Sequence, residues 1–104
     1  MEKLELQFNR DMWGIYSNTI TETKYNPGYF RKMLDDFGGL GTAKKLLAKD
    51  DTSSGFTELY ELDRLDLTVE ALIIDNKEKY KKLFSDEEIE TADRRLRELN
   101  YFKK

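Results

Sequence analysis

The stretch GFTELYELDRLDLTVEALIID, residues 55–75, is the longest run of the sequence in which apolar side chains occupy more than one face of a helix. Those at helical spacing are Phe56, Leu59, Tyr60, Leu65, Val69, Leu72 and Ile73, whereas Leu62, Leu67 and Ile74 fall outside these stripes. A helix with one apolar stripe lies on a core, and a helix that is apolar nearly all round lies inside it. We therefore expect this segment at the centre, with the other helices packed around it.

The residues before this segment predict three amphipathic helices. In the first, over residues 2–23, apolar side chains recur at every fourth position. Asn26 and Pro27 are typical of a helix start, because the amide caps free N–H groups and proline needs no acceptor in the first turn. Gly38 and Gly39 end that second helix, and a short third helix covers residues 40–47.

The central segment and the helix that follows it have their own start signals. A polar loop over residues 49–54 precedes the segment, and Ser54 is a plausible helix cap there. We expect a bend near Arg64 to split the segment, with Asp66 capping its second half. Ser85 and Glu88 form a capping box, which starts the last helix.

These patterns predict an all-α fold. We expect a single domain over residues 1–104, a compact arrangement of about six to seven short helices around a central apolar helical segment. No stretch alternates apolar and polar residues for long enough to require a strand.

Composition narrows the function classes. The 104 residues include no cysteine and no histidine, which excludes disulfides, Cys/His zinc sites and imidazole catalysis. No apolar run approaches the roughly 20 residues that a membrane span needs, so we expect a cytoplasmic protein and no membrane partner. The net charge of −3 is uneven: residues 1–76 carry nine Lys and Arg against fourteen Asp and Glu, and residues 77–104 carry nine against seven.

Known catalytic and cofactor motifs are missing from the sequence. The glycines at 38, 39 and 41 lack the G-x-x-x-x-G-K-[ST] spacing of a phosphate loop, and the polar loop over residues 49–54 lacks the EF-hand pattern. Carboxylates are plentiful, but no two of them stand out as a general acid/base pair. We therefore expect no enzyme activity, no cofactor and no metal.

The densest acidic cluster is the candidate partner-binding site. Its members are Glu58, Glu61, Asp63, Asp66 and Glu70, followed by Asp50 and Asp51 on the polar loop. Such a patch is able to bind a Lys- and Arg-rich surface that normally holds nucleic-acid phosphates, in a salt-dependent way. The structural alternative is that Asp63 and Asp66 cap the bend, that Arg64 pairs with one of them, and that the glutamates are simply solvated.

A basic C-terminal surface is the competing site. Its cations are Lys77, Lys79, Lys81, Lys82, Arg94, Arg95 and Arg97. Acidic residues lie among the three arginines, a pattern that favours ion pairs along an exposed helix over nucleic-acid contacts. A helix-turn-helix over residues 40–62 is also disfavoured, because its second helix carries acids where a recognition helix needs donors. Direct nucleic-acid binding is therefore the less favoured hypothesis.

The sequence also resembles a known protein family over nearly the whole chain. Its most specific part is the run RLDLTVEAL over residues 64–72. Other matching parts are Gly38-Gly39, Thr42-Ala43-Lys44-x-Leu46-Leu47, Ser54-Gly55-Phe56-Thr57-x-Leu59-Tyr60-Glu61-Leu62, Leu83-Phe84-Ser85, Glu87-Glu88, and Phe8, Met12, Tyr16, Phe30 and Met33. This pattern resembles a widespread family of small helical proteins from bacteria and phages. That family in turn resembles one from which a type II anti-CRISPR protein, an inhibitor of Cas9, has been drawn.

The resemblance implies a non-enzymatic protein in the cytoplasm of a bacterial host cell that inhibits a type II CRISPR effector by binding Cas9 or its guide RNA complex. Cas9 holds nucleic acid in basic channels, which an acidic helical protein could occupy. The alternative is a helical adaptor or regulatory protein of a bacterial defence or stress system with no CRISPR role. No catalytic motif comes with the family, and the oligomeric state stays open.

Overall fold

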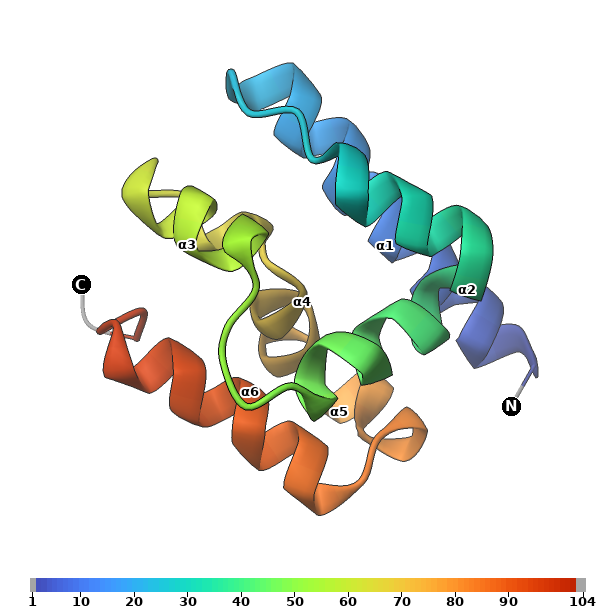
Figure 1. The fold of residues 1–104 in the computed structure, drawn as a ribbon. Helices are drawn as coiled ribbons and strands as arrows, with labels where there is room; N and C mark the ends of the chain where they lie inside the picture. Colours follow the sequence, from blue (N-terminus) through green and yellow to red (C-terminus); the bar gives the residue numbers. More distant parts are fainter. Residues whose placement is uncertain (1, 103–104) are drawn as a thin grey trace.

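The computed structural model describes residues 2–102 and begins with two long helices. Helix α1 (Glu2–Glu22) is followed by helix α2 (Gly28–Ala48), whose first half runs antiparallel to α1 (Figure 1). Phe8 and Met12 of α1 are fully buried. The bounds of α1 confirm the predicted first helix. Helix α2 begins one residue later than Asn26 and Pro27 suggest, and no side chain caps it, so the expected Asn26 cap is wrong.

Gly38 divides α2 into the two helices that the sequence predicts. Its φ of 74° lies in the left-handed region, which glycine adopts without steric cost. Gly39 has a different role, because a Cβ there would lie 2.7 Å from the Cα of Asn9. The Asn9 side chain also accepts a hydrogen bond from the Gly39 N–H at 2.7 Å. The glycine pair therefore both bends α2 and lets its backbone touch α1.

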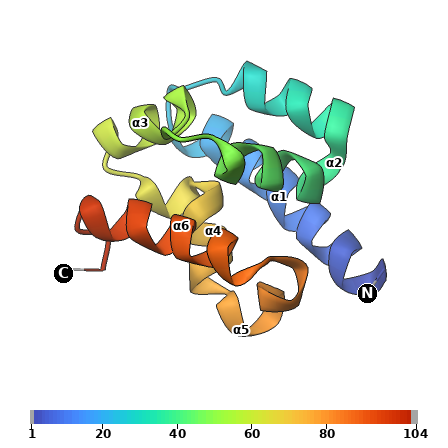
Figure 2. The ribbon, with the colours of Figure 1, turned by 60° about the horizontal axis from the view of Figure 1, so that its bottom comes forward.

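The segment over residues 55–75 is central only in its second half. It forms α3 (Ser54–Glu61), the 3₁₀ turn η1 (Leu65–Leu67) and α4 (Val69–Asp75). Helix α4 contacts both α1 and α6 (Asp86–Glu98) (Figure 2). Ile73 of α4 is fully buried. Helix α3 lies at the edge, where Tyr60 is 46% exposed and Leu62 39% exposed. The prediction of a wholly buried segment is wrong for α3, because this short helix turns only Phe56 and Leu59 inward.

Two predicted caps are displaced. Ser53 rather than Ser54 caps α3, and its hydroxyl accepts a hydrogen bond from the Phe56 N–H at 3.1 Å. Thr68 rather than Asp66 caps α4 through the Ala71 N–H, also at 3.1 Å. A hydroxyl buried beside the first turn makes this bond without bringing a charge into the interior.

The C-terminal part follows the prediction closely. Helix α5 (Lys77–Tyr80) and the turn η2 (Lys81–Leu83) lead into α6. The Ser85–Glu88 capping box is present, with both of its hydrogen bonds formed. After α6 the chain turns back, and the Tyr101 hydroxyl donates to the Asp75 carboxylate at 2.5 Å.

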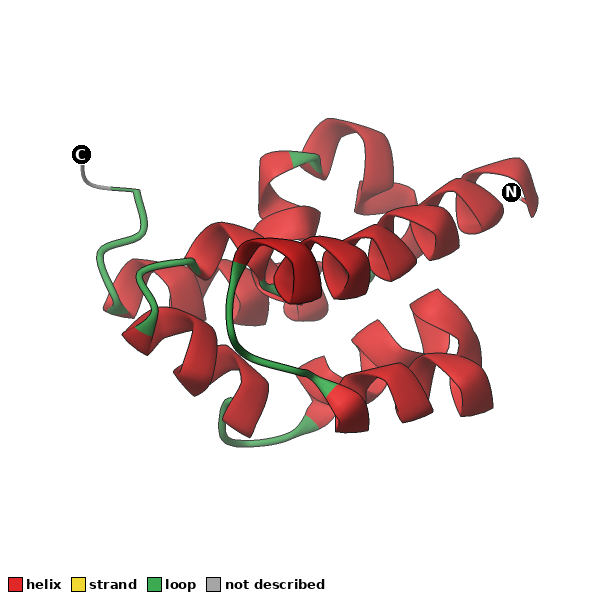
Figure 3. Ribbon diagram, turned by 90° about the horizontal axis from the view of Figure 1, so that it is seen from above, coloured by secondary structure: helices red, strands yellow, loops and turns green. Residues whose placement is uncertain are grey.

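Helices and turns make up the whole of the described chain, and no strand occurs in it (Figure 3). The all-α class is therefore confirmed. The larger apolar cluster lies among α1, α2, α4 and the α5–α6 region: Phe8, Met12, Met33, Leu34, Ala43, Leu46, Leu47, Val69, Ile73, Tyr80, Leu83, Phe84 and Ala92. A smaller one beside α3 contains Phe56, Leu65, Ala71 and Leu96. None of the helices within residues 2–102 is both long and apolar enough to cross a membrane.

Candidate functional site: the acidic face and the buried ion pair

Glu58 and Glu61 lie on the outer side of α3. Phe56 and Leu59 of the same helix are buried, and the 3.6-residue repeat therefore turns Glu58 and Glu61 away from the core. Both carboxylates are exposed. The expectation that these two residues are accessible is confirmed.

Asp63 follows directly at the C-terminal end of α3, where it is exposed and has a φ of 60°. The Asp63 N–H donates to the Tyr60 carbonyl at 3.0 Å, and the Arg64 N–H donates to the Leu59 carbonyl at 2.8 Å. This pair of bonds is the Schellman motif, which needs a left-handed residue at the position of Asp63. Aspartate tolerates that conformation better than most residues, so the backbone turn fixes its carboxylate at the helix end.

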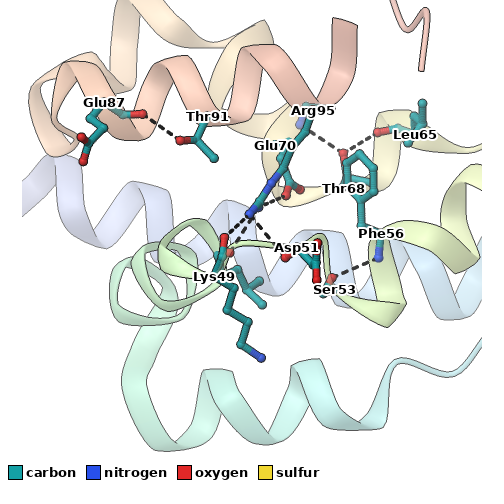
Figure 4. A network of polar contacts seen from close by, with 12 residues as sticks. Lys49, Asp51, Ser53, Phe56, Leu65, Thr68, Glu70, Glu87, Thr91 and Arg95 are labelled. Carbon is teal, nitrogen blue, oxygen red and sulfur yellow. Dashed lines mark hydrogen bonds and ion pairs between the residues drawn. The ribbon is translucent and has the colours of Figure 1, made fainter. Parts of the chain in front are cut away.

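Asp50 and Asp51 lie on the loop between α2 and α3. Arg95 of α6 reaches this loop from the interior and donates to the backbone carbonyls of Lys49 at 2.7 Å and Asp51 at 3.4 Å (Figure 4). These bonds use backbone oxygens only, and both aspartates are exposed. The buried arginine thus holds the loop while its two carboxylates stay accessible.

Asp66 is exposed, but it forms an ion pair with Arg64. The Arg64 guanidinium donates to both of its carboxylate oxygens at 3.0 Å, and also to Glu22 of α1 at 2.6 Å. These hydrogen bonds raise the pKa of Arg64 further above its usual range. The pairing of Arg64 with Asp66 confirms that part of the structural alternative, and it removes much of the charge that Asp66 would offer a partner.

Glu70 does not belong to the accessible patch, which corrects the sequence-based prediction. Its side chain is buried, and the residue is only 4% exposed. Its carboxylate accepts a hydrogen bond from the Arg95 guanidinium at 3.0 Å (Figure 4). Arg95 is 3% exposed, so it too is lost from the predicted basic C-terminal surface.

Each charge of this buried pair is balanced by the opposite charge and by hydrogen bonds. Burial raises the pKa of the Glu70 carboxyl, and the hydrogen bond and charge of Arg95 oppose that rise. Arg95 also donates to the Leu46 carbonyl at 3.2 Å. Carbonyl groups at a helix C-terminus lack partners within the helix and carry partial negative charge. A single guanidinium therefore neutralises Glu70 and satisfies the end of α2.

The sequence contained a signal for this pair. Arg95 lies three residues after Ala92 and four before Leu99, which puts it on the inward stripe of α6. Glu70 is likewise three residues before Ile73, on the inward stripe of α4. An isolated charge at such a position is costly, so two opposite charges on inward stripes indicate a buried pair. The prediction that both residues lie on the surface is therefore wrong.

We use the name acidic face for five carboxylates: Asp50, Asp51, Glu58, Glu61 and Asp63. All five are exposed, and none forms an ion pair with any residue between positions 2 and 102. The charge of Glu58 also affects Tyr25, which lies in the α1–α2 turn. Burial is the larger cause that raises the pKa of Tyr25, and the negative charge of Glu58 raises it further. The five carboxylates of the acidic face come from the α2–α3 loop, the outer side of α3 and the bend after it.

The basic C-terminal surface is partly neutralised. The Lys79 ammonium lies 4.0 Å from the Asp11 carboxylate, Lys81 pairs with Glu78 at 3.6 Å, and Arg97 pairs with Asp93 at 3.0 Å. With Arg95 in the interior, fewer free cations remain there than the sequence suggests.

The carboxylates do not converge on a metal site. Within residues 2–102 no group of three or more His, Cys, Asp or Glu side chains could hold a metal ion.

Comparisons of the chain with protein-family models, with curated proteins and with solved structures found no match.

Proposed function

We propose that this protein is a non-enzymatic inhibitor that binds a basic surface of a protein partner through the acidic face. The partner class follows from charge, since Lys- and Arg-rich channels that hold nucleic-acid phosphates attract clustered carboxylates. The resemblance of the sequence to an anti-CRISPR family makes Cas9, or its guide RNA complex, the first partner to test.

The observation that carries this proposal is the absence of ion pairs at the acidic face within the described chain. Some other carboxylates of the described chain do have cationic partners, as Asp66 and Glu22 with Arg64 or Asp93 with Arg97. An unpaired cluster costs some stability through self-repulsion, and a cationic partner would relieve that repulsion. Tyr60 and Leu62, both exposed beside Glu61, add apolar contact area of the kind that anchors interfaces.

The mechanism proposed is competition for a channel. Cas9 holds the guide–target duplex in a positively charged channel and reads the adjacent motif with arginines. Carboxylates spread along a rigid helix and its flanking loops could take the positions of successive phosphates. Binding of this kind should weaken as salt rises, because salt screens the charges and reduces the free energy gained when counterions are released.

The first experiment compares two double charge reversals of equal size. Glu58→Lys with Glu61→Lys changes the acidic face. Glu87→Lys with Glu90→Lys changes another exposed pair three residues apart, on α6. Each variant is tested in a Cas9 DNA-cleavage assay at two salt concentrations, with the circular-dichroism melt as a control for folding. We expect inhibition by the wild type and the α6 variant, and none by the α3 variant.

The remaining outcomes separate the alternatives. Undiminished inhibition by the α3 variant would contradict the acidic-face mechanism. Loss of inhibition in the double variant Lys81→Glu with Lys82→Glu would assign the contact to the basic C-terminal surface. No inhibition by excess wild-type protein would favour the adaptor or regulatory hypothesis, under which the acidic face serves another basic partner.

A further inference from the structure

A second candidate site lies inside the protein, between α3 and the pair formed by α1 and α2. A cavity of about 120 Å³ lies there, partly open to solvent, and its lining includes Phe30 and Met33 of α2 and Phe56 and Leu59 of α3. We propose that the cavity binds a small neutral aromatic molecule that carries one hydroxyl or N–H group.

The size and the lining favour an aromatic ring. In another protein, an apolar cavity of about 150 Å³ binds benzene, so the volume here is in the range of a single ring. Phe30 and Phe56 provide two aromatic side chains from opposite walls. Rings in contact prefer edge-to-face or offset arrangements, which add specificity to the apolar contact.

The polar group of the ligand is inferred from Thr19 of α1, which also lines the cavity. This residue is 1% exposed, and its hydroxyl has no hydrogen-bond partner among the residues that the structure describes. The other buried hydroxyl of the lining, on Thr68, is already used by the Leu65 carbonyl and the Ala71 N–H. A buried hydroxyl strongly favours a partner, and a ligand hydroxyl or N–H at this wall would supply one.

The charges around the cavity favour a neutral molecule. Among its lining residues, only Lys49 and Glu70 are charged. Glu70 is neutralised by Arg95 at 3.0 Å, and Lys49 is exposed at the rim. An ion in the cavity would lose its hydration without gaining an opposite buried charge, which is unfavourable.

Gly55, near the start of α3, is one of the residues that line the cavity. A Cβ at this position would lie 3.4 Å from the Tyr25 hydroxyl oxygen, an ordinary contact. The Gly55→Leu variant should therefore fold, and its new side chain should lie against Tyr25 and extend into the cavity. Gly14 of α1 offers the matched control, because it does not line the cavity and a Cβ there meets nothing within 4 Å.

A titration with phenol, indole and benzene, followed by ¹H–¹⁵N NMR, tests the proposal. We expect saturable shifts at residues lining the cavity for the wild type and Gly14→Leu, and at least a tenfold loss of affinity in Gly55→Leu. Thr19→Val should weaken phenol binding by about fivefold while leaving benzene binding unchanged, because it removes one hydrogen bond.

Thr42→Val is the control for that last result. The Thr42 hydroxyl is also buried and without a partner in the described chain, but it does not line the cavity. No saturable shift for any of the three probes would overturn the proposal. So would equal effects of Thr19→Val and Thr42→Val, or phenol binding that survives Gly55→Leu. None of these results depends on the partner of the acidic face, so the two proposals fail separately.

Discussion

The Arg95 guanidinium and the Glu70 carboxylate meet at 3.0 Å inside the protein, and through this contact α6 is joined to α4. The same guanidinium donates to the carbonyls of Leu46 and Lys49 at the end of α2. Three helices and the loop that carries Asp50 and Asp51 therefore depend on one side chain. The loop's place in the acidic face is a consequence of this buried contact.

Replacing Arg95 should be among the most destabilising changes in the chain. Arg95→Met leaves Glu70 buried without its partner, and removal of one member of a buried pair costs about 3–5 kcal/mol. Urea denaturation measures the loss. Glu70→Leu combined with Arg95→Met should recover part of that loss, because no buried charge remains, but the carbonyls of α2 still lack a donor. A cost below about 1 kcal/mol for Arg95→Met would show that the pair is not formed in solution.

Gly39 and Gly14 should respond oppositely to alanine. A Cβ at Gly39 would meet the Cα of Asn9 at 2.7 Å, and backbone cannot move away cheaply, so Gly39→Ala should separate α1 from α2 and lower the melting temperature. Gly14 lies in α1 with open space around it, and Gly14→Ala should stabilise the protein by about 1 kcal/mol through helix propensity. Thermal melts of both variants test this, and equal shifts would contradict the close approach at Gly39.

Asp63 should tolerate glycine but not alanine. Its φ of 60° suits glycine, whereas alanine pays the full cost of the left-handed conformation, about 1–2 kcal/mol. We expect Asp63→Gly to melt at or above the wild-type temperature and Asp63→Ala to melt below it. Asn100, which has the same φ at the end of α6, should show the same order. Asp63→Gly then removes one charge of the acidic face without loss of the fold.

Acid should destabilise the protein partly through Glu88. Burial of this carboxyl favours its neutral form, but hydrogen bonds from the Lys44 ammonium and the Ser85 N–H, both at 2.8 Å, lower its pKa overall. A carboxyl whose pKa is lower in the folded state adds stability above its unfolded value, and that stability is lost as the pH falls through the folded value. The loss should therefore begin below about pH 4.5.

Melting temperatures of the wild type and Glu88→Gln between about pH 6 and 3 test this linkage. The variant should be less stable at pH 6, and the difference should shrink as the pH falls. Glu87→Gln is the control, since the exposed Glu87 has no ion pair within residues 2–102. A constant difference across the range would contradict the role of the Glu88 charge.

Local patterns were sufficient for most of the helices. The capping box at Ser85 and the glycines at 38 and 39 act within a few residues of themselves, so their effect on the chain could be predicted from spacing alone. Apolar periodicity likewise predicted α1 and α6 closely, because burial of one stripe is a property of the helix itself. The caps of α3 and α4 were misplaced by one or two residues, since Ser53, Ser54, Asp66 and Thr68 are all able to cap and packing selects among them.

The depth of each side chain, in contrast, was decided by tertiary packing. Glu70 and Glu58 both lie in the acidic stretch of the sequence, yet one is paired in the interior and the other exposed on α3. The difference arises because α4 lies between α1 and α6, where Arg95 is available, whereas α3 covers only an edge. Local sequence gives the period of a helix and its charges, but only the assembled helices determine which charge finds a partner and which cavity remains between them.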